Sequence, residues 1–424
     1  MADLSQNGAG RHAIIVGGGV IGAACAYYLA CAGWRATILE QNRFASGCSH
    51  GNCGYISPSH VMPLAEPGVV LKTLKWMLKG DSPLYVRPSL NFTLWSWMVN
   101  FARRANHNAM MESAKGLAPI LRSTAELYEQ LLTQEPIDAE WEKVGCWFIY
   151  RTPEAMAAYD PTDRIMREEL DTPGTRYDGR QLAEMEPALR DDLAGGWLYE
   201  QDWHVRPDKL MSGWRQVLEA MGVEIREGVK VEGFAARNGR AAAARTSQGE
   251  VEGDEFVVAT GAWAPQFARE LGGRIPIQPG KGYSLTMRRP ERCPVRPMIF
   301  QEHKVAITPM KSGYRIGSTM EFSGYDTSLN PKRISALKRG ADLYFQDPAD
   351  LATVEEEWYG WRPMTYDSRP IIDRSPRFEN AWIAAGHSML GLTLAPATGK
   401  LITEMITGEK PHVDPAPFAI RRFG

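Results

Sequence analysis

The sequence lacks the cysteine patterns that hold small secreted proteins together. Its 424 residues include six cysteines, which form no C-x-x-C pair and no zinc-ligand spacing. Residues 1–11 are polar and glycine-rich, unlike a signal peptide. We therefore expect reduced cysteines, no metal site and a cytoplasmic location.

An excess of charge of either sign is also absent. The 48 basic and 50 acidic side chains give a net charge of −2, which provides no basic field for a nucleic-acid partner. Residues 12–34 form one long apolar run, but five glycines interrupt it, so we predict no transmembrane helix. The apolar share of 44% and the charged share of 23% are those of a globular protein and exclude intrinsic disorder.

The first organised segment of the chain has the pattern of a βαβ unit. A β-branched run at residues 13–16 precedes a glycine turn, an alanine-rich stretch covers residues 23–32, and a second short apolar run covers residues 36–40. A strand, a helix and a strand within about 30 residues place the two strands parallel to each other.

The glycine turn carries the motif Gly17-x-Gly19-x-x-Gly22, which follows a strand and opens a helix, as a dinucleotide-binding fingerprint must. Gly17 permits the tight turn, Gly19 lets a pyrophosphate approach the backbone, and Gly22 allows close packing of helix and strand. Glu40 ends the second strand, where its carboxylate can accept hydrogen bonds from ribose hydroxyls. The pattern predicts a nucleotide without a 2′-phosphate, and NAD and FAD both remain open at this point.

Further elements are indicated along the rest of the chain. Amphipathic spacing predicts a helix over residues 116–132, and alternating apolar residues predict an antiparallel sheet over residues 275–322. Other expected elements are strands at 145–151, 223–231, 255–261 and 381–385, and helices at 207–221, 330–344, 350–358 and 397–407.

Two later segments favour FAD over NAD. Residues 259–263 (Ala-Thr-Gly-Ala-Trp) resemble the second strand and turn that flavoproteins place against the cofactor. Trp361-Arg362-Pro363 and the loop and helix at residues 386–399 resemble the flavin-end segments of one flavoenzyme superfamily. An NAD-dependent enzyme would leave the 386–399 segment unexplained.

With these segments, the chain resembles the D-amino acid oxidase superfamily of FAD enzymes, and more narrowly the bacterial D-amino acid dehydrogenases. The narrower resemblance rests on short motifs at residues 54–58, 63, 65–68, 71–76, 305–309 and 315–322. It implies an α/β fold, α+β overall, with a Rossmann-like FAD-binding domain built from residues 1–60, 180–275 and 356–424. Residues 61–179 and 276–355 would form a substrate domain with an antiparallel sheet and helices.

The resemblance also implies the residues that surround a non-covalent FAD. His50 lies one residue away from the histidine that attaches the flavin covalently in some relatives, so we expect no covalent bond. The implied contacts are Gly17, Gly19, Val20, Ile21 and Gly22 at the pyrophosphate, Glu40 and Gln41 at the adenosine ribose, Ser49, Asn52 and Gly54 on the phosphate–ribityl side, Val231 at adenine, Thr260 and Gly261 beside the cofactor, and Gly386, Leu390, Gly391, Leu392 and Thr393 around the isoalloxazine.

An amino-acid substrate needs a cation or strong donors for its carboxylate. Arg315 lies in an alternating strand, where it either faces the cavity or lies on the surface. Arg362 either binds the substrate or supports the flavin-end loop. Tyr283 and His387 complete the predicted catalytic set, and Lys281, His303, Tyr55 and Tyr314 are further candidates.

The resemblance implies an enzyme that oxidatively deaminates an amino acid, with D-amino acids or proline-like amines preferred. Hydride transfer from the α-carbon to flavin N5 would give a 2-oxo acid and ammonia, or a cyclic imine, and the electrons would pass to a quinone-type acceptor. The alternatives are a sarcosine- or glycine-type oxidase that uses oxygen and a non-catalytic flavin-binding partner. The lysine-punctuated apolar stretch at residues 69–79 is either a buried helix or a peripheral contact with the inner face of a membrane.

Overall fold

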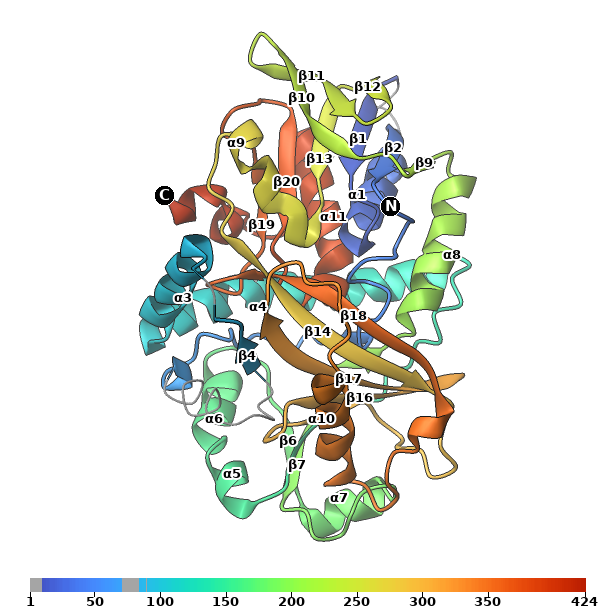
Figure 1. Ribbon diagram of the computed structural model, residues 1–424, viewed down its shortest axis with the longest axis vertical. Helices are drawn as coiled ribbons and strands as arrows, with labels where there is room; N and C mark the ends of the chain where they lie inside the picture. Colours follow the sequence, from blue (N-terminus) through green and yellow to red (C-terminus); the bar gives the residue numbers. More distant parts are fainter. Residues whose placement is uncertain (1–9, 71–83, 89) are drawn as a thin grey trace.

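Two sheets of different construction organise the chain, one in the upper half and one in the lower half of Figure 1. The computed structural model describes residues 10–70, 84–88 and 90–424. The predicted membrane-contact stretch at residues 69–79 lies largely outside the described residues. Among the described helices, none is long and apolar enough to cross a membrane.

The upper sheet, called the parallel sheet below, contains six strands among the described residues, in the order β19-β20-β13-β1-β2-β9. β1 pairs in parallel with both β2 and β13, and only β19 runs antiparallel to its neighbour. The strand bounds are β1 His12–Val16, β2 Arg35–Glu40, β9 Glu224–Glu227, β13 Glu255–Val258, β19 Ile371–Arg374 and β20 Ala381–Ala385. The predicted βαβ unit is therefore the centre of this sheet.

Two helices with many small residues pack side by side against the parallel sheet. α1 (Val20–Cys31) connects β1 to β2, and α11 (Gly391–Thr407) follows β20. A Cβ atom added to Gly399 of α11 would lie 2.5 Å from the carbonyl carbon of Ala24 in α1, so only glycine permits this close approach. α11 begins six residues before the predicted start at residue 397, and its Pro396 lies in the second turn rather than before the helix.

The lower sheet, called the large sheet below, contains nine strands among the described residues, in the order β18-β14-β17-β16-β15-β5-β7-β6, with β4 paired to β17. Its strands β14, β16 and β17 are antiparallel neighbours, as the alternation over residues 275–322 predicts. The bounds are β4 Leu84–Val86, β5 Cys146–Tyr150, β6 Thr175–Asp178, β7 Gly195–Tyr199, β14 Ile277–Met287, β15 Met298–Phe300, β16 Val305–Met310, β17 Gly313–Phe322 and β18 Val354–Thr365.

Helices and short strands cover the two sheets and connect them. The long helix α4 passes between the two sheets in Figure 1, and its Tyr128 donates a hydrogen bond to the carbonyl of Leu392 in α11 at 2.6 Å. The remaining helices are α3 Phe92–Arg104, α4 His107–Gln134, α5 Pro153–Ala157, α6 Asp160–Glu168, α7 Gly179–Met185, α8 Pro207–Ala220, α9 Ala268–Leu271 and α10 Pro331–Asp342, and the remaining strands are β3 Tyr55–Ile56, β8 Trp203–His204, β10 Val231–Arg237, β11 Arg240–Thr246 and β12 Gly249–Glu252.

The helix predicted at residues 350–358 is wrong. A single 3₁₀ turn, Leu351–Thr353, is followed by the strand β18, which pairs with β14 along its whole length. The three glutamates at 355–357 favour a helix when they are considered alone. Pairing with a long buried neighbour outweighs that local preference, and Glu355 and Glu357 point to solvent on one face of the strand.

The strands of the large sheet do not stop at the predicted domain boundaries. β7 lies after residue 180 and most of β18 lies after residue 356, yet both strands belong to the large sheet. The mixed α/β fold class is confirmed, and the division into domains remains a prediction.

Candidate cofactor site

A long cavity opens where β1, β2 and β13 of the parallel sheet reach their carboxyl ends. Its empty volume is about 1220 Å³ with the open mouth included. The lining residues are Val16–Ile21, Leu39–Arg43, Ala45–Ser49, Asn52, Val229–Val231, Ala259–Trp263, Gln266, Phe267, Trp361–Pro363, Ala384, His387–Met389, Gly391 and Leu392. Ligands of open α/β sheets bind at this edge, where loops leave the strands.

The glycine turn at one end of the cavity allows no side chains at two positions. Gly17 has a φ angle of +108°, and a Cβ atom there would lie 2.7 Å from the carbonyl oxygen of Ala259. A Cβ atom on Gly22 would lie 1.9 Å from the carbonyl oxygen of Gly17. At Gly19 the nearest described atom would be the Ser49 Oγ at 3.6 Å, so the backbone there is open to a ligand.

Glu40 supports this turn as well as lining the cavity. Its Oε2 accepts a hydrogen bond from the backbone N–H of Gly18 at 2.7 Å, and its Oε1 accepts one from the N–H of Asn42 at 2.8 Å. Each carboxylate oxygen can accept a second hydrogen bond. The predicted role of Glu40 at a ribose is therefore compatible with its position.

The N-termini of two helices meet at the same cavity. α1 begins after Gly19 and α11 after Leu390, and neither of these N-cap residues provides a side-chain cap. At the start of α1, the N–H of Val20 donates to the Ser49 Oγ at 3.0 Å. Uncapped N–H groups and the positive end of a helix dipole attract anions, so the cavity suits a phosphate group and a second electron-rich group.

Two buried donors in the lining have no hydrogen-bond partner among the described residues. They are the Thr260 Oγ1 and the Trp361 Nε1. A buried polar group without a partner costs free energy, so an absent ligand with acceptor atoms would resolve both. The uncapped helices, the open backbone at Gly19 and these donors together fit FAD.

The end of the cavity opposite the glycine turn is formed by the segments 361–363 and 387–392, which contact each other. The N–H of Ser388 donates to the carbonyl of Pro363 at 3.0 Å. The imidazole of His387 lies 3.0 Å from the Thr398 Oγ1, and burial lowers the pKa of His387 to about 3. His387 is therefore neutral at physiological pH.

Most of the predicted cofactor residues line the cavity, and the rest shape the backbone beside it. Lining residues are Gly17, Gly19, Val20, Ile21, Glu40, Gln41, Ser49, Asn52, Val231, Thr260, Gly261, Gly391 and Leu392. Outside the lining are Gly22, Gly54, Gly386, Leu390 and Thr393. For example, a Cβ atom on Gly54 would lie 2.1 Å from the Val205 carbonyl oxygen, and the Thr393 Oγ1 donates to the Tyr55 carbonyl at 2.9 Å.

The predicted catalytic residues divide into two groups. Arg362 and His387 line the cavity, and the Arg362 Nη1 donates to the Thr319 carbonyl at 2.7 Å. Arg315 and Tyr283 are each 1% exposed and lie outside the lining. Tyr283 donates to the Glu321 Oε2 at 3.2 Å, and desolvation by burial, with Glu321 adding to it, raises the pKa of this phenol.

Arg315 differs from both positions that the sequence predicts for it. It is neither a surface residue nor a cavity residue, because its guanidinium is buried and bonded to the backbone of residues 50 and 52. The other candidates are also bonded within the protein: Lys281 to the Ser328 carbonyl, Tyr55 to the carbonyls of Met298 and Ile307, and His303 to Tyr344. Tyr314 lies buried in the core of the large sheet.

Several lining residues were not predicted from the sequence. Arg43 and Lys230 bring two cations, and Trp263 brings an indole that packs at 5.5 Å, centroid to centroid, from that of Trp361. Each lies within three residues of a predicted contact. These three residues could have been predicted if the whole turn beside each strand, rather than the single residue that matches the family, had been assigned to the cavity.

The parallel sheet, its fingerprint and the cavity at its carboxyl edge define a dinucleotide-binding fold whose cavity fits FAD. Residues 12–405 match the DAO family, described as FAD dependent oxidoreductase, and the chain belongs to this family. The predicted superfamily, the FAD cofactor and the enzyme class are thereby confirmed.

Curated relatives are similar over nearly the whole chain. The chain is 30% identical over 422 residues to a D-amino acid dehydrogenase of Granulibacter bethesdensis, covering 97% of this chain and 99% of the relative. It is 31% identical over 420 residues to a D-amino acid dehydrogenase of Xanthobacter autotrophicus, covering 97% of this chain and 98% of the relative.

Solved structures share the fold at lower identity. A glycine oxidase from Geobacillus kaustophilus superposes with a TM-score of 0.77 at 22% identity, covering 97% of this chain and 98% of that one. An L-proline dehydrogenase from P. horikoshii also gives a TM-score of 0.77, at 18% identity and 98% coverage of both chains. These likenesses concern the fold, which is the two-sheet arrangement described above.

Proposed function

We propose that this FAD enzyme oxidatively deaminates an amino acid, with D-amino acids and proline-like secondary amines preferred, and passes the electrons to a quinone-type acceptor. The proposal is supported by the two curated relatives, which are named D-amino acid dehydrogenases. The chain is similar to both over nearly its whole length. The observation that carries it in this chain is the position of Arg362 in the cavity lining.

Arg362 is the cation suited to a substrate carboxylate. Of the three cations in the lining, Arg43 and Lys230 adjoin the predicted adenosine contacts Glu40 and Val231. Arg362 instead lies beside the segment 387–392, at the opposite end. Its Nη1 is held by the Thr319 carbonyl at 2.7 Å, which leaves donors on Nη2 and Nε for a carboxylate.

Aromatic rings beside Arg362 support an apolar substrate side chain. Trp361 packs edge to face against Trp263 at 5.5 Å and against Tyr325 at 5.8 Å, and Trp263 stacks on Tyr325 at 6.0 Å. The Tyr325 hydroxyl is engaged by the Ala262 carbonyl at 2.6 Å, which leaves the apolar ring faces for contact. Such a wall favours alkyl, aromatic or pyrrolidine side chains over charged ones.

The role of the chain's own residues is to bind and orient the substrate. Bound FAD supplies a two-electron acceptor for the hydrogen on the substrate's α-carbon. Arg362 fixes the carboxylate, the rings of Trp263 and Trp361 exclude water, and the neutral His387 adds no positive charge near the reacting carbon. The imine product then reacts with water to give a 2-oxo acid and ammonia.

A non-covalent FAD is also part of the proposal. His50 lies outside the cavity lining, and its Nε2 lies 2.8 Å from the Glu356 Oε1. Acid precipitation of the purified yellow protein is expected to release all the flavin into the supernatant. Flavin that stays with the precipitated chain would contradict the non-covalent part alone.

Anaerobic mixing with a panel of D- and L-amino acids, glycine, sarcosine and both proline enantiomers tests the substrate. We expect D-forms to bleach the oxidised flavin band fastest, followed by fast turnover with a quinone analogue and slow reoxidation by air. Rapid hydrogen peroxide formation would favour a glycine- or sarcosine-type oxidase, and faster reduction by L-forms would contradict the handedness. A yellow protein that no amine reduces would indicate a non-catalytic flavin partner.

Replacing Arg362 separates substrate binding from support of the loop. Loss of charge-assisted hydrogen bonds worth roughly 1.5–3 kcal/mol should weaken substrate binding about 10- to 150-fold in Arg362→Met, with partial recovery in Arg362→Lys. FAD content is expected to remain near that of the wild type. If Arg362→Met loses FAD and retains its substrate affinity, Arg362 supports the loop instead.

We also propose a peripheral membrane contact, which would give access to a quinone. The helix α3, at the left of Figure 1, has the exposed side chains that such a contact needs. Phe92, Trp95 and Val99 recur at helical spacing on its outer side and are 86%, 47% and 49% exposed, and Leu90 just before it is 93% exposed. The basic side chains Arg103 and Arg104 end the helix. Apolar and basic groups on one surface helix suit an anionic bilayer.

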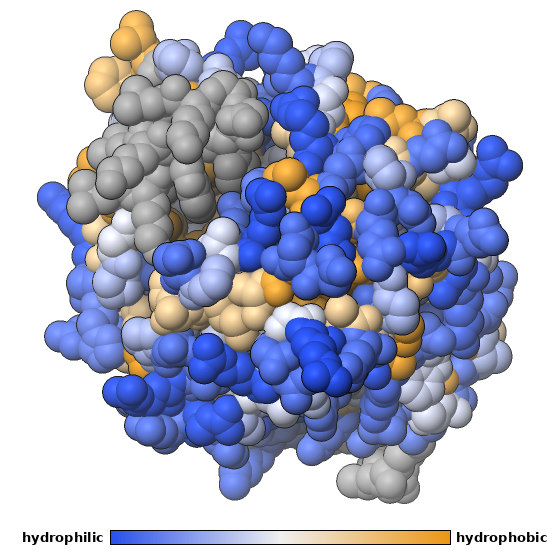
Figure 2. All heavy atoms as spheres, turned by 90° about the horizontal axis from the view of Figure 1, so that it is seen from below, coloured by the Kyte–Doolittle hydropathy of each residue, from blue (hydrophilic) through white to orange (hydrophobic). Residues whose placement is uncertain are grey.

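Sedimentation with vesicles tests this contact. Away from the residues drawn in grey, the lower face of the molecule is largely hydrophilic, with an apolar band across its middle (Figure 2). We assign the contact to α3 because of its exposed apolar side chains. Vesicles with anionic lipid should carry the wild type down, and Phe92→Asp should reduce this. Leu351→Asp, at a 42% exposed apolar residue on another surface, is the matched control. Equal sedimentation of both variants would contradict the role of α3.

A further inference from the structure

The loop at residues 48–54 contacts the cofactor cavity but has no regular secondary structure of its own. Cys48, Ser49 and Asn52 line the cavity, and Ser49 also accepts the hydrogen bond from the first turn of α1. Within the loop, the Asn52 Oδ1 accepts from the N–H of Gly54 at 2.8 Å. The backbone carbonyls of such a loop need partners from elsewhere.

Four consecutive carbonyls of this loop, at residues 50–53, accept hydrogen bonds from side chains of the large sheet. The carbonyls of His50 and Asn52 accept from the Arg315 Nη1 at 3.0 and 2.7 Å. The carbonyl of Gly51 accepts from the Ser284 Oγ at 3.0 Å, and that of Cys53 accepts from the Thr308 Oγ1. We call these four acceptors the carbonyl run.

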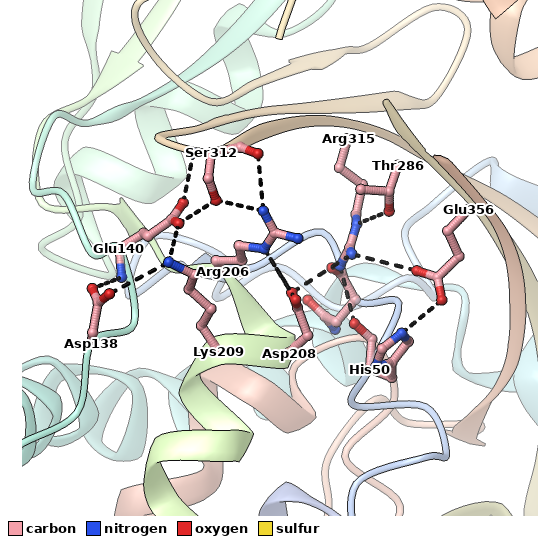
Figure 3. A network of polar contacts seen from close by, with 11 residues as sticks. His50, Asp138, Glu140, Arg206, Asp208, Lys209, Thr286, Ser312, Arg315 and Glu356 are labelled. Carbon is pink, nitrogen blue, oxygen red and sulfur yellow. Dashed lines mark hydrogen bonds and ion pairs between the residues drawn. The ribbon is translucent and has the colours of Figure 1, made fainter. Parts of the chain in front are cut away.

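The donors come from adjacent strands and are rigidly held. Ser284 lies on β14, Thr308 on β16 and Arg315 on β17, and the backbones of all three strands pair with one another through β17. Their exposed fractions are 2%, 0% and 1%. The Arg315 Nε also donates to the Thr286 Oγ1 at 3.0 Å, which fixes the orientation of the guanidinium (Figure 3).

The charge of Arg315 is balanced by two long ion pairs. Its Nη2 lies 3.9 Å from the Asp208 Oδ1 and 4.0 Å from the Glu356 Oε2. Both carboxylates have closer partners, because Asp208 accepts from the Arg206 Nε at 3.1 Å and Glu356 lies 2.8 Å from the His50 Nε2 (Figure 3). The shortest hydrogen bonds of the guanidinium are therefore those to the loop and to Thr286.

An indole ring closes the loop from the other side. A Cβ atom on Gly51 would lie 2.0 Å from the Trp358 Cδ2, so the ring of Trp358 packs directly on the loop backbone. Trp358 belongs to β18, three residues before the segment 361–363 that lines the cavity. The loop therefore contacts side chains from four strands of the large sheet.

We propose that Arg315 is a positioning residue that holds the loop at residues 48–54 in the shape that FAD requires. Ser284 and Thr308 assist it by donating to the other two carbonyls of the run. Arg315 then acts on the cofactor through the loop and does not bind the substrate carboxylate. The inference rests on the FAD site and is independent of which amine is oxidised.

FAD titration of reconstituted apoprotein tests the proposal directly. Arg315→Met removes the donor to two carbonyls, and charge-assisted hydrogen bonds of roughly 1.5–3 kcal/mol predict FAD binding weakened about 10- to 150-fold. Arg315→Lys, with a single ammonium group, should recover part of this loss. The visible circular dichroism of the bound flavin should change in Arg315→Met, because the loop no longer holds one shape.

Arg206→Met is the matched control, since Arg206 pairs with Asp208 and Ser312 in the same network, whereas the carbonyl run accepts its hydrogen bonds from Ser284, Thr308 and Arg315. Its FAD affinity should stay within about twofold of the wild type. At saturating FAD, Arg315→Met should keep its KM for the amine within a few-fold. An increase in KM of about a hundredfold with unchanged FAD affinity would overturn the proposal and make Arg315 a substrate ligand.

A double variant covers the case in which Arg315→Met does not fold. Thr308→Val with Ser284→Ala removes the two neutral donors and leaves Arg315 in place, so a smaller loss of FAD affinity, about 5- to 20-fold, is expected. Wild-type FAD affinity and flavin circular dichroism in this double variant would overturn the role of the carbonyl run.

Discussion

The two ends of the cofactor cavity are built in different ways. At the fingerprint end, Gly17, Gly22 and Glu40 come from one short βαβ unit, and most contacts are made by the backbone. At the opposite end, the segments 361–363 and 387–392 contact each other. The loop at 48–54 extends from the start of α1 along the cavity, and buried side chains of another sheet hold it in place. Local geometry forms the first end, and long-range hydrogen bonds form the second.

This difference affects how each end should respond to substitution. A backbone cradle tolerates no added atom at its tightest positions, Gly17 and Gly22, but depends on few side chains. A loop held by several side-chain donors should lose its shape in steps, one donor at a time. The predictions below test that contrast, beginning with the largest effect.

The strongest test of the fingerprint end is Gly22→Ala. The added Cβ would lie 1.9 Å from the Gly17 carbonyl oxygen, so α1 and β1 must separate. Overpacking of up to about 3 kcal/mol predicts FAD binding weakened about a hundredfold. The flavin-to-protein absorbance ratio measures this, with far-UV circular dichroism to confirm folding.

Gly47→Ala is its control, because Gly47 also lines the cavity and a Cβ atom there would have no described atom within 4 Å. A normal flavin content in Gly22→Ala would contradict the backbone account of this end.

The next largest effect is expected for Glu40→Ala. The variant loses the acceptor for the N–H groups of Gly18 and Asn42 as well as for a ribose hydroxyl. FAD affinity should fall about 10- to 150-fold, and Glu40→Gln should lie between, since one amide oxygen remains. Flavin fluorescence quenching on apoprotein gives the dissociation constants. An unchanged constant in Glu40→Ala would show that the fingerprint end depends on the backbone alone.

Asp202 tests the support of the opposite end. Asp202 is fully buried and accepts hydrogen bonds from the Ser59 N–H at 3.0 Å and the Ser59 Oγ at 2.6 Å. Ser57, two residues earlier in the chain, donates its N–H to the Thr393 Oγ1 of α11. Burial raises the pKa of Asp202 from 3.8 to about 7, against the effect of these hydrogen bonds. The folded state therefore keeps a proton that the unfolded state loses, and stability falls as pH rises from about 4 to 7.

Asp202→Asn should remove that pH dependence. The Tm of the variant minus that of the wild type should increase by about 1–3 °C from pH 5 to pH 8. Above pH 8 this difference should stay constant. Thermal unfolding across this range is the measurement. A constant Tm difference at all pH values would show that Asp202 keeps its charge when buried.

The smallest effect is expected for the pair of His50 and Glu356. The hydrogen bond between them raises the pKa of His50 and lowers that of Glu356. The stabilisation by His50 is fully present below its unfolded pKa near 6.5 and is lost as pH rises through the folded pKa, whereas that by Glu356 is lost as pH falls below about 4.5. Both side chains are more than a third exposed, so the effect should be weak and salt-dependent.

His50→Gln should therefore lower Tm by about 1 °C at pH 5.5 in low salt, and by less at pH 8.5 or in 1 M salt. An equal loss at both pH values would show that the pair acts by hydrogen bonding without charge.

Much of the fingerprint end could be predicted because its information is local. Gly17, Gly19 and Gly22 lie in the turn, and Glu40 ends the next strand, all within one βαβ unit whose periodicity is visible in the sequence. The start of α11 is predicted six residues too late, and Pro396 lies inside the helix. The proline leaves the Leu392 carbonyl without a backbone N–H donor, and the Tyr128 hydroxyl donates to that carbonyl instead.

The opposite end depends on information that is not local. The alternating pattern around Arg315 predicts a strand, and β17 confirms it, but alternation does not reveal that both faces of this strand are buried. A buried arginine facing the loop at 48–54 depends on contacts across more than half of the chain. The same limit explains β18, where glutamates favour a helix until β14 is present to pair with them.

The segments that line the cavity are synthesised far apart in time, because they lie far apart in the sequence. The ribosome releases β1 before β13, and Gly391 follows only after β13. A nascent chain therefore has no complete binding site for the flavin until Gly391 has left the ribosome. Because a bound ligand draws the folding equilibrium toward the native state, we expect a supply of flavin at that moment to protect the new chain from proteolysis.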